Sequence, residues 1–322
     1  MLTMDNKATR FLARMGSRGT LGQAVFDWAN EGNDFFAISA DLAHASGFDR
    51  IIEKYPERFV DVGIAEQNLI GVSAGLAETG LPVIATSWAM FTSVRVADQV
   101  RNFMGAMQLN IKLIGMDGGF VQSRFSNSHS NPPDIAIMRA IPGITILSPC
   151  DGVEEYKAII AALEHKGPVY IRLTGGALTP IVHKNPDFEF VIGKSITLKE
   201  GTDVAILSTG NITKNALDAA AILEEQNIST KVVDMHTIVP LDTDMLDELS
   251  NYKLIITVEE HLLNGGFGSA VAQYYADKKQ KPLHIMMGIN NCYPKPGRVK
   301  YIEATNGLTP EHIAHKIISN LT

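Results

Sequence analysis

Residues 61–77 read DVGIAEQNLIGVSAGLA, a stretch that combines a helical repeat with one isolated carboxylate. Small and apolar side chains recur at helical spacing, which predicts a helix over residues 65–80 that ends at a glycine. Glu66 lies at the start of this helix, and no lysine or arginine stands close to it in the sequence. A buried carboxylate is costly unless it meets a hydrogen-bond donor or takes up a proton. Glu66 is therefore either a first-turn residue that faces the helix dipole or a functional carboxylate.

Short apolar runs and amphipathic helical stretches alternate on both sides of Glu66. This alternation predicts an α/β fold in which a mostly parallel sheet has helices on both faces. The predicted strands cover residues 35–42, 82–91, 111–117, 144–149 and 168–173, and the predicted helices cover 18–32, 65–80, 93–108, 133–141 and 152–167.

A segment rich in glycine and proline, GGALTPIVHKNPDFEF at 175–190, interrupts this pattern and is typical of a linker. The alternation then resumes in the remaining part of the chain. We therefore predict two doubly wound domains, residues 1–185 and a smaller domain at 186–322. In the second domain, strands are expected over 203–210, 229–235, 254–260 and 282–288, and helices over 215–226 and 265–278.

The composition limits the classes of partner. The chain has 322 residues, of which 45% are hydrophobic, and its formal net charge is −7. It has no basic stripe with interleaved aromatics, so we expect neither nucleic acid nor a membrane as a partner. No apolar run reaches the roughly 18 residues of a spanning helix. Cys150 and Cys292 lie far apart and suggest no disulfide framework, which favours a cytoplasmic location.

Common catalytic signatures are missing from the sequence. No P-loop, nucleophile elbow, CxxC or HExxH pattern occurs. The segment GGFGSA at 265–270 resembles part of a dinucleotide fingerprint, but it lacks the third glycine and the acidic residue beyond it. A structural turn between a strand and a helix is therefore the favoured interpretation of this segment.

Several polar and aromatic residues follow predicted strands, where ligand sites of α/β sheets gather. His129 lies in the polar loop RFSNSHSNPPD and is either a surface histidine or a site residue. Asp41 follows the first strand and is either a helix cap or a site residue. Trp88 and Phe91 in SWAMF are either core aromatics or a platform for a cofactor.

Taken in order, several of these segments resemble the transketolase family of thiamine diphosphate enzymes. The resemblance extends from about Arg18 to the segment that ends at Ala314, and it is closest to the C-terminal section of a two-chain transketolase. It implies a pyrimidine-binding domain followed by a transketolase C-terminal domain, and the transfer of a two-carbon ketol unit from a ketose to an aldose. The segments are ISADLA, DVGIAEQNLIGVSAGLA, TSWAMF, DIAIMRAIPGITILSPCD, GPVYIRL and EEHLLNGGFGSAV.

The resemblance assigns roles to residues of this chain. Glu66 matches the family glutamate that bonds to a ring nitrogen of the cofactor's aminopyrimidine, and His129 matches a histidine that handles protons of substrate hydroxyls. These two residues are the predicted catalytic groups. The positions predicted to bind the cofactor are Asp41, Leu42, Glu66, Trp88 and Phe91.

One part of the family's site is missing. The family binds diphosphate and Mg²⁺ through a GDG motif and a later asparagine, and this chain contains no GDG. The resemblance therefore implies a partner, an N-terminal subunit that carries this motif and holds Mg²⁺, in an α2β2 assembly in which this chain also self-associates. We assign no metal ligand to this chain itself.

The predicted substrate pocket departs from the family pattern. Arg18 matches a contact to the sugar phosphate and is retained, but Asp117 and Gly175 stand where the family has a phosphate-binding histidine and arginine. Phe125 replaces an acidic residue that contacts a substrate hydroxyl. Because Asp117 would repel a phosphate, we predict that ordinary pentose phosphates are poor substrates. The predicted substrate positions are Arg18, Asp117, Phe125 and His129, and an unphosphorylated or modified sugar is the expected substrate.

Two alternatives stay open at this point. NSHSN is similar to the histidine loop of 2-oxo acid dehydrogenase β subunits, and Asp117 is a point of similarity to deoxyxylulose phosphate synthases, so the chain could be half of another thiamine diphosphate enzyme. A non-catalytic scaffold subunit is the other alternative. The segment DIAIMRAIPG favours transketolase, and the retention of Glu66 and His129 argues against a scaffold.

Overall fold

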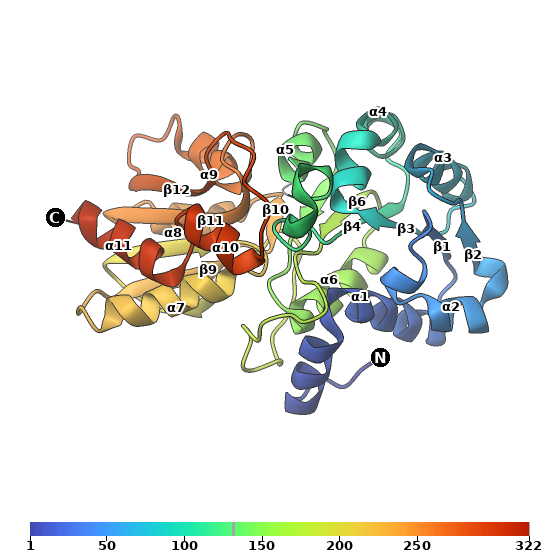
Figure 1. Ribbon diagram of the computed structural model, residues 1–322, viewed down its shortest axis with the longest axis horizontal. Helices are drawn as coiled ribbons and strands as arrows, with labels where there is room; N and C mark the ends of the chain where they lie inside the picture. The colour runs from blue at the N-terminus through green and yellow to red at the C-terminus, as the bar shows by residue number, and fades with distance from the viewer. Residues whose placement is uncertain (131–132, 322) are drawn as a thin grey trace.

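A computed structural model describes residues 1–130 and 133–321, and it shows two β-sheets joined by the linker (Figure 1). In the first sheet all strands are parallel except β10, which is antiparallel to β5. This arrangement confirms the predicted α/β class with a mostly parallel sheet. The strand order is β10-β5-β6-β4-β3-β1-β2, formed by β1 (Phe36–Ser39), β2 (Phe59–Asp61), β3 (Val83–Trp88), β4 (Ile111–Met116), β5 (Thr145–Leu147), β6 (Val169–Arg172) and β10 (Thr237–Val239).

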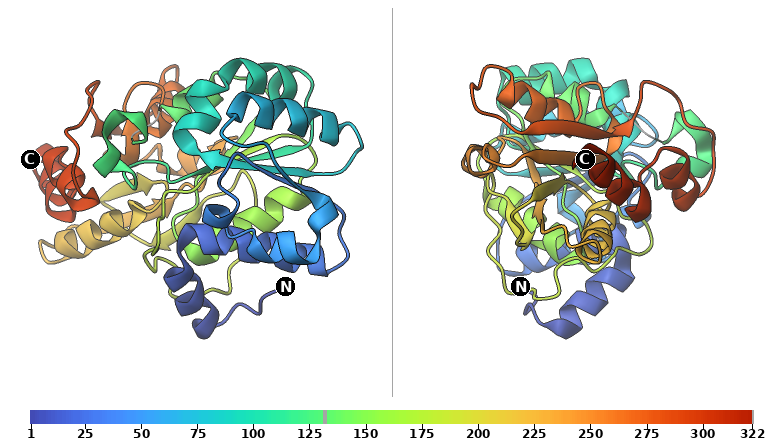
Figure 2. Two further views of the ribbon diagram at one scale, coloured as in Figure 1. Left: turned by 45° about the vertical axis from the view of Figure 1, so that its right-hand side comes forward. Right: turned by 90° about the vertical axis from the view of Figure 1, so that its left-hand side faces the viewer.

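Helices cover both faces of this sheet, as Figures 1 and 2 show. On one face, α1 (Asn6–Asn30), α2 (Asp49–Lys54) and α6 (Gly152–Glu164) bury a core that includes Leu21 and Ile159. On the other face, α3 (Glu66–Ala77), α4 (Ala97–Val100) and α5 (Asp134–Arg139) bury a second core that includes Leu69 and Met138. The central strands are therefore buried on both sides, as their continuous apolar sequences predict.

The second sheet has the strand order β12-β11-β8-β9-β7, in which only β7 is antiparallel. One core lies under α7, α10 and α11, and another lies under α8 and α9. The strands are β7 (Ile196–Lys199), β8 (Val204–Ser208), β9 (Thr230–Asp234), β11 (Leu254–Leu262) and β12 (Leu283–Ile289), and the helices are α7 (Thr213–Glu224), α8 (Thr243–Leu249), α9 (Phe267–Tyr275), α10 (Val299–Thr305) and α11 (Pro310–Leu321).

One strand from the second half of the chain, β10, belongs to the first sheet. Residues 175–190 contain neither helix nor strand, and β10 lies beyond them in the sequence but pairs with β5 of the first sheet. A division of the chain near residue 185 stays a prediction, because β10 connects the two halves through backbone hydrogen bonds. None of the helices in the described part of the chain combines the length and hydropathy needed to cross a bilayer.

The helix predicted over 93–108 differs from the observed structure. Two π-helical turns, Phe91–Arg95 and Arg101–Ala106, flank the short helix α4. Hydrophobic periodicity does not separate these wider turns from an α-helix, because both leave apolar residues on one side. Helix α1 also begins earlier than predicted and is kinked at Gly16, which has φ 66°. A Cβ at Gly16 would lie 2.2 Å from the Gly176 carbonyl oxygen, so this close approach to the linker requires glycine.

The segment GGFGSA forms a structural turn at the start of α9, as predicted. The buried carboxylate of Glu259 accepts hydrogen bonds from the backbone N–H groups of Phe267 (2.7 Å) and Gly268 (2.8 Å). A Cβ at Gly268 would lie 2.7 Å from the hydroxyl of Thr257, so glycine allows the helix to pack against β11. The turn therefore binds a carboxylate of its own chain in the position where a dinucleotide fingerprint would place phosphate.

A buried ion pair joins the two sheets. Asp134 Oδ2 accepts hydrogen bonds from Arg172 Nε (2.9 Å) and from the Tyr170 hydroxyl (2.8 Å). Arg172 Nη2 also donates to the Glu260 carbonyl oxygen at 2.7 Å. Both charged side chains are fully buried. The pair thus connects α5, β6 and β11, and it fixes the end of the loop that carries His129.

We predict that Asp134→Ala lowers the free energy of unfolding by about 3–5 kcal/mol, because it removes the ion-pair partner of the buried Arg172 guanidinium. Urea unfolding followed by circular dichroism measures this change. Asp98→Ala is the matched control, since it removes the exposed pair with Arg101, which contributes at most about 1 kcal/mol. Similar losses in both variants would contradict the structural role given to Asp134.

Candidate active site

The fold brings the predicted site residues to one edge of the first sheet. Strands β4, β3, β1 and β2 are adjacent and parallel, so their carboxyl ends meet at the same edge. The ends of these strands and the segments that follow them carry all but one of the predicted residues, and Arg18 of α1 joins them. Trp88 is the last residue of β3, and the predicted residues that follow the strands are Asp41, Leu42, Glu66, Phe91, Asp117, Phe125 and His129.

Glu66 is the first residue of α3, and its carboxyl group is buried. Its Oε2 accepts a hydrogen bond from Arg95 Nη1 at 2.7 Å. The cation that is missing near Glu66 in the sequence is thus supplied by a residue 29 positions later. The Arg95 side chain is 45% exposed, so it reaches the buried carboxylate from the surface. Sequence analysis did not identify Arg95 as a site residue.

His129 lies between two phenylalanines. Its ring centroid is 5.1 Å from that of Phe91, in an edge-to-face arrangement, and 5.7 Å from that of Phe125. The guanidinium of Arg95 lies over the first of these rings, 4.0 Å from the centre of Phe91. Glu66, Arg95, Phe91 and His129 therefore form one continuous series of contacts across the sheet edge.

Arg18 and Asp117 contact one another. Arg18 Nη2 donates to Asp117 Oδ2, which also accepts a hydrogen bond from the Gln122 amide. The Asp117 side chain is fully buried, and its burial raises the pKa of this carboxyl group, although the hydrogen bond from Arg18 acts in the opposite direction. The Arg18 guanidinium also lies 4.7 Å from the centre of the Trp88 ring. Asp117 thus pairs with the charge of Arg18, the residue predicted to contact a sugar phosphate.

Asp41 and Leu42 lie in the loop after β1. Asp41 has φ 60°, and its backbone N–H donates to Asp61 Oδ1 at 3.0 Å. Its own carboxylate is exposed and caps no helix, because the following 3₁₀ turn has Ala43 at its N-cap. Leu42 packs against the same core as Trp88. This loop therefore presents an exposed carboxylate beside an apolar side chain that packs in the core.

A cavity of about 290 Å³ lies beside Arg18 and Phe125. It is also lined by Arg124 and by Arg298, which precedes α10. In residues 1–130 and 133–321, neither of these two guanidinium groups has an ion-pair or hydrogen-bond partner. Sequence analysis found neither residue, because Arg298 is distant in the sequence and belongs to no motif.

The position of Gly175 leaves no room for a long basic side chain. A Cβ at this residue would lie 2.2 Å from the Ser17 hydroxyl and 2.4 Å from a methyl group of Thr179. The local packing therefore disfavours the arginine that the resemblance leads us to expect at this position.

Together these groups can bind a flat, polar heterocycle and an anionic or hydroxylated ligand beside it. The buried carboxylate of Glu66 can exchange a hydrogen bond or a proton with a ring nitrogen. Trp88 and Phe91 offer apolar ring surfaces, and the His129 imidazole offers a hydrogen-bond donor or acceptor beside them. The arginines around the adjacent cavity can bind an anionic group.

Comparison with known proteins shows the family of this chain. The family profile "Transketolase, pyrimidine binding domain" matches residues 14–180, and "Transketolase, C-terminal domain" matches residues 193–313. The chain is 36% identical to the 6-deoxy-6-sulfo-D-fructose transketolase subunit SqwH of Clostridium sp. (strain MSTE9), over 93% of this chain and 94% of that protein. It is 35% identical to an apulose-4-phosphate transketolase subunit of Phocaeicola vulgatus, over 92% of this chain and 94% of that protein.

A solved structure is also similar along almost the whole chain. This structure is described as a split gene transketolase, inactive beta4 tetramer. It superimposes with a TM-score of 0.84 at 32% identity, and the match covers 95% of this chain and 97% of that one.

Proposed function

Because this chain belongs to the transketolase family, in which it corresponds to the C-terminal section of a two-chain enzyme, we propose that it binds the pyrimidine end of thiamine diphosphate. In this proposal the complete enzyme transfers a two-carbon ketol unit from a ketose to an aldose. The observation that carries the proposal is the buried Glu66 carboxylate, which shares one sheet edge with Trp88, Phe91 and His129.

The residues at this edge fit one end of the cofactor. Glu66 would hold a proton between its carboxylate and a ring nitrogen, and Trp88 and Phe91 would keep water away from the ring. Arg95 donates to the same carboxylate, so a bound pyrimidine would share or replace this donor. Thiamine diphosphate, when bound, supplies the electron sink for breaking and forming carbon–carbon bonds. His129 would move the proton of a substrate hydroxyl.

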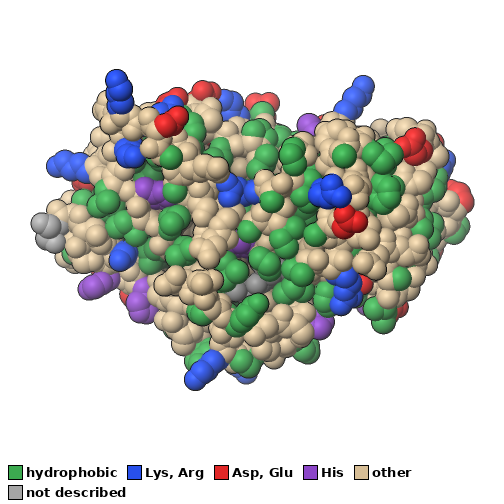
Figure 3. Space-filling view, turned by 90° about the horizontal axis from the view of Figure 1, so that it is seen from above, with side chains coloured by type: hydrophobic (Ala, Val, Ile, Leu, Met, Phe, Trp, Pro, Cys, Tyr) green, Lys and Arg blue, Asp and Glu red, His purple; other side chains and the backbone are tan. Residues whose placement is uncertain are grey.

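The other end of the cofactor requires a second chain. This sequence has no GDG motif to bind diphosphate and Mg²⁺, so we propose an N-terminal partner subunit that supplies both, in an α2β2 assembly. Large hydrophobic side chains are exposed close to the site residues in sequence, among them Ile64 (78%) and Val94 (46%). Figure 3 shows hydrophobic side chains spread over the face above α3, α4 and α5. Such a surface suits burial against another subunit.

The substrate pocket supports an atypical sugar. Asp117 forms an ion pair with Arg18, which makes Arg18 less available to a phosphate. The packing at Gly175 leaves no room for a basic side chain. Two groups that would grip a phosphate in the usual place are thus neutralised or missing. Arg124 and Arg298 add positive charge to the lining of the same cavity. We therefore propose a ketose that is uncharged or carries its charge in a different position. The 6-deoxy-6-sulfo-D-fructose named for one relative supports this class, whereas the apulose 4-phosphate named for the other carries a phosphate.

The first prediction concerns the isolated chain. We expect it neither to bind thiamine diphosphate tightly nor to turn over a ketose, because the diphosphate and Mg²⁺ would find no ligands on it. Isothermal titration calorimetry with cofactor and Mg²⁺ measures the binding. A dissociation constant of about 1 μM, which corresponds to about −8 kcal/mol, would exclude the two-chain arrangement.

A second prediction concerns the role of Glu66 in the reconstituted enzyme. Glu66→Gln keeps the shape of the side chain but removes its acid–base function, so kcat should fall at least about 100-fold. The thermal unfolding temperature should change little, because the amide can still form hydrogen bonds. Glu78→Gln, at the exposed end of the same helix, is the control and should retain full activity. Activity of Glu66→Gln within a few-fold of wild type would remove Glu66 from the mechanism.

A third prediction concerns the substrate. In the two-chain enzyme, xylulose 5-phosphate should react poorly, mainly through a high KM, because Arg18 is already paired with Asp117. Unphosphorylated xylulose and 6-deoxy-6-sulfofructose are the comparison substrates in a steady-state panel. If xylulose 5-phosphate gives a kcat/KM above about 10⁴ M⁻¹ s⁻¹, the range of well-matched enzymes, the proposed effect of Asp117 and Gly175 is wrong.

A further inference from the structure

Four buried side chains that lie outside the proposed active site converge between the two sheets. Cys150 follows β5, and Glu154 lies in the first turn of α6. His183 belongs to the linker, and Asp234 ends β9 of the second sheet. One ligand atom from each of these residues lies within 4.8 Å of the others. The mechanism proposed above uses none of them.

The polar atoms in this cluster lack ordinary partners. His183 Nε2 lies 3.4 Å from Glu154 Oε1 and 3.6 Å from Asp234 Oδ2. Among the described residues, these atoms and Asp234 Oδ1 form no hydrogen bond, and all three side chains are at most 4% exposed. Burying unpaired carboxylate and imidazole atoms is costly, so the cluster calls for a ligand that satisfies several of them at once.

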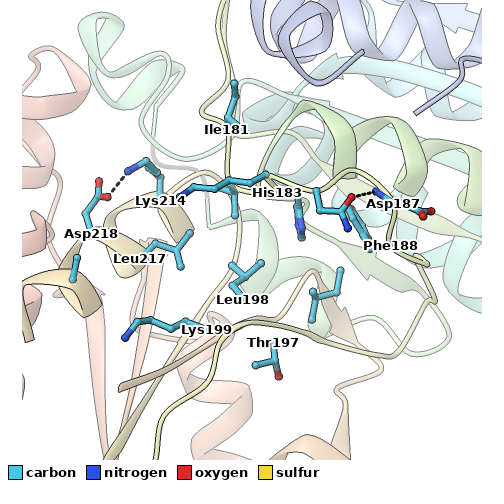
Figure 4. Close-up of a pocket in the computed structure, with 15 residues that line it drawn as sticks. Ile181, His183, Asp187, Phe188, Thr197, Leu198, Lys199, Lys214, Leu217 and Asp218 are labelled. Atoms are coloured by element: carbon cyan, nitrogen blue, oxygen red, sulfur yellow. Dashed lines mark hydrogen bonds and ion pairs between the residues drawn. The ribbon is translucent and has the colours of Figure 1, made fainter. Parts of the chain in front are cut away.

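The surrounding residues hold the cluster in place. Asp151 Oδ2 accepts hydrogen bonds from the backbone N–H groups of Val182 (2.9 Å) and His183 (2.8 Å), which fixes the linker. The Cys150 N–H donates to Glu154 Oε2 at 2.7 Å, so the unpaired Oε1 faces the cluster. The His183 ring stacks on Phe188 with a centroid distance of 4.0 Å, and Figure 4 shows these two side chains together. Such supporting contacts are typical of residues that orient metal ligands.

We propose that Cys150, Glu154, His183 and Asp234 bind one Zn²⁺ ion. In a tetrahedral zinc site with bonds of about 2.0–2.3 Å, neighbouring ligand atoms are roughly 3.3–3.8 Å apart. Both distances from His183 Nε2 fall in this range. A thiolate, an imidazole and two carboxylates suit zinc, which accepts sulfur, nitrogen and oxygen ligands. Zinc binding would release the proton of the Cys150 thiol to solvent.

A zinc ion at this point would have a structural role. Four protein ligands leave no position for a substrate or a catalytic water. The ligands come from the first domain, the linker and the second sheet, so one ion would join three segments that are distant in sequence. His183 also lines a surface cavity of about 560 Å³ between the linker, β7 and α7.

The competing state of the cluster is a metal-free ion network. Burial by itself lowers the pKa of His183, but Asp234 and Glu154 outweigh this effect and raise the pKa to about 10. A protonated His183 between two carboxylates would then take the place of the metal. The two states differ in metal content, in thiolate coordination and in the effect of a chelator, so they can be separated by experiment.

The test uses the full chain, purified without a metal-affinity step. Inductively coupled plasma mass spectrometry should find about one zinc ion per chain, and a chelator should lower the thermal unfolding temperature until zinc is restored. Reloading with Co²⁺ should give a thiolate-to-cobalt charge-transfer band. Cys150→Ser should abolish this band, and Asp234→Asn should weaken zinc binding by at least about 100-fold.

Cys292→Ser is the control, because Cys292 is the exposed cysteine and its removal should change neither the stoichiometry nor the band. Fewer than about 0.1 zinc ions per wild-type chain after incubation with excess ZnCl₂ would overturn the proposal. Equal zinc binding by wild type and folded Asp234→Asn would also overturn it, since the ion would then lie elsewhere. Neither result depends on enzyme activity, so failure here leaves the proposed function unaffected.

Discussion

The buried pair of Asp134 and Arg172 is the interaction on which the arrangement of this chain depends. Arg172 ends a central strand of the first sheet, and Asp134 begins the helix after the loop that carries His129. The same guanidinium donates to the carbonyl oxygen of Glu260 in the second sheet. One buried cation thus sets the position of the loop relative to the sheet and of the second domain relative to the first. Because neither charge is solvated, each holds the other in a single geometry.

Charge pairing also decides what the site edge can bind. Glu66 and Asp117 are both buried acids, and each meets an arginine that is partly exposed, Arg95 and Arg18 respectively. In the first pair, the carboxylate remains next to aromatic rings that suit a heterocycle. In the second pair, the arginine is the group that loses its freedom to bind an anion. The same type of ion pair therefore leaves the Glu66 carboxylate beside aromatic rings and makes Arg18 less available to an anionic ligand.

In the proposed function, this chain would provide one side of a composite site. Its residues would hold a heterocycle and a sugar, and a partner would supply the GDG motif for diphosphate that this sequence lacks. Such a partner would also cover the exposed apolar side chains near the proposed catalytic positions. The zinc site proposed around His183 would have a different role, because it would hold segments of the two sheets together and would bind no substrate.

The sequence alone determined the α/β class, the order of most strands and helices, and the residues at the carboxyl edge. Hydrophobic periodicity and the spacing of polar residues after strands contain this information, because both depend on neighbours along the chain. The contact of Glu66 with Arg95 and that of Arg18 with Asp117 span 29 and 99 residues, and no local pattern marks them. The π-helical turns around α4 and the placement of β10 were equally invisible to periodicity. Only the tertiary structure decided these features, because packing brings side chains that are distant in sequence within hydrogen-bonding distance. A buried carboxylate then needs such a partner to offset the cost of its desolvation.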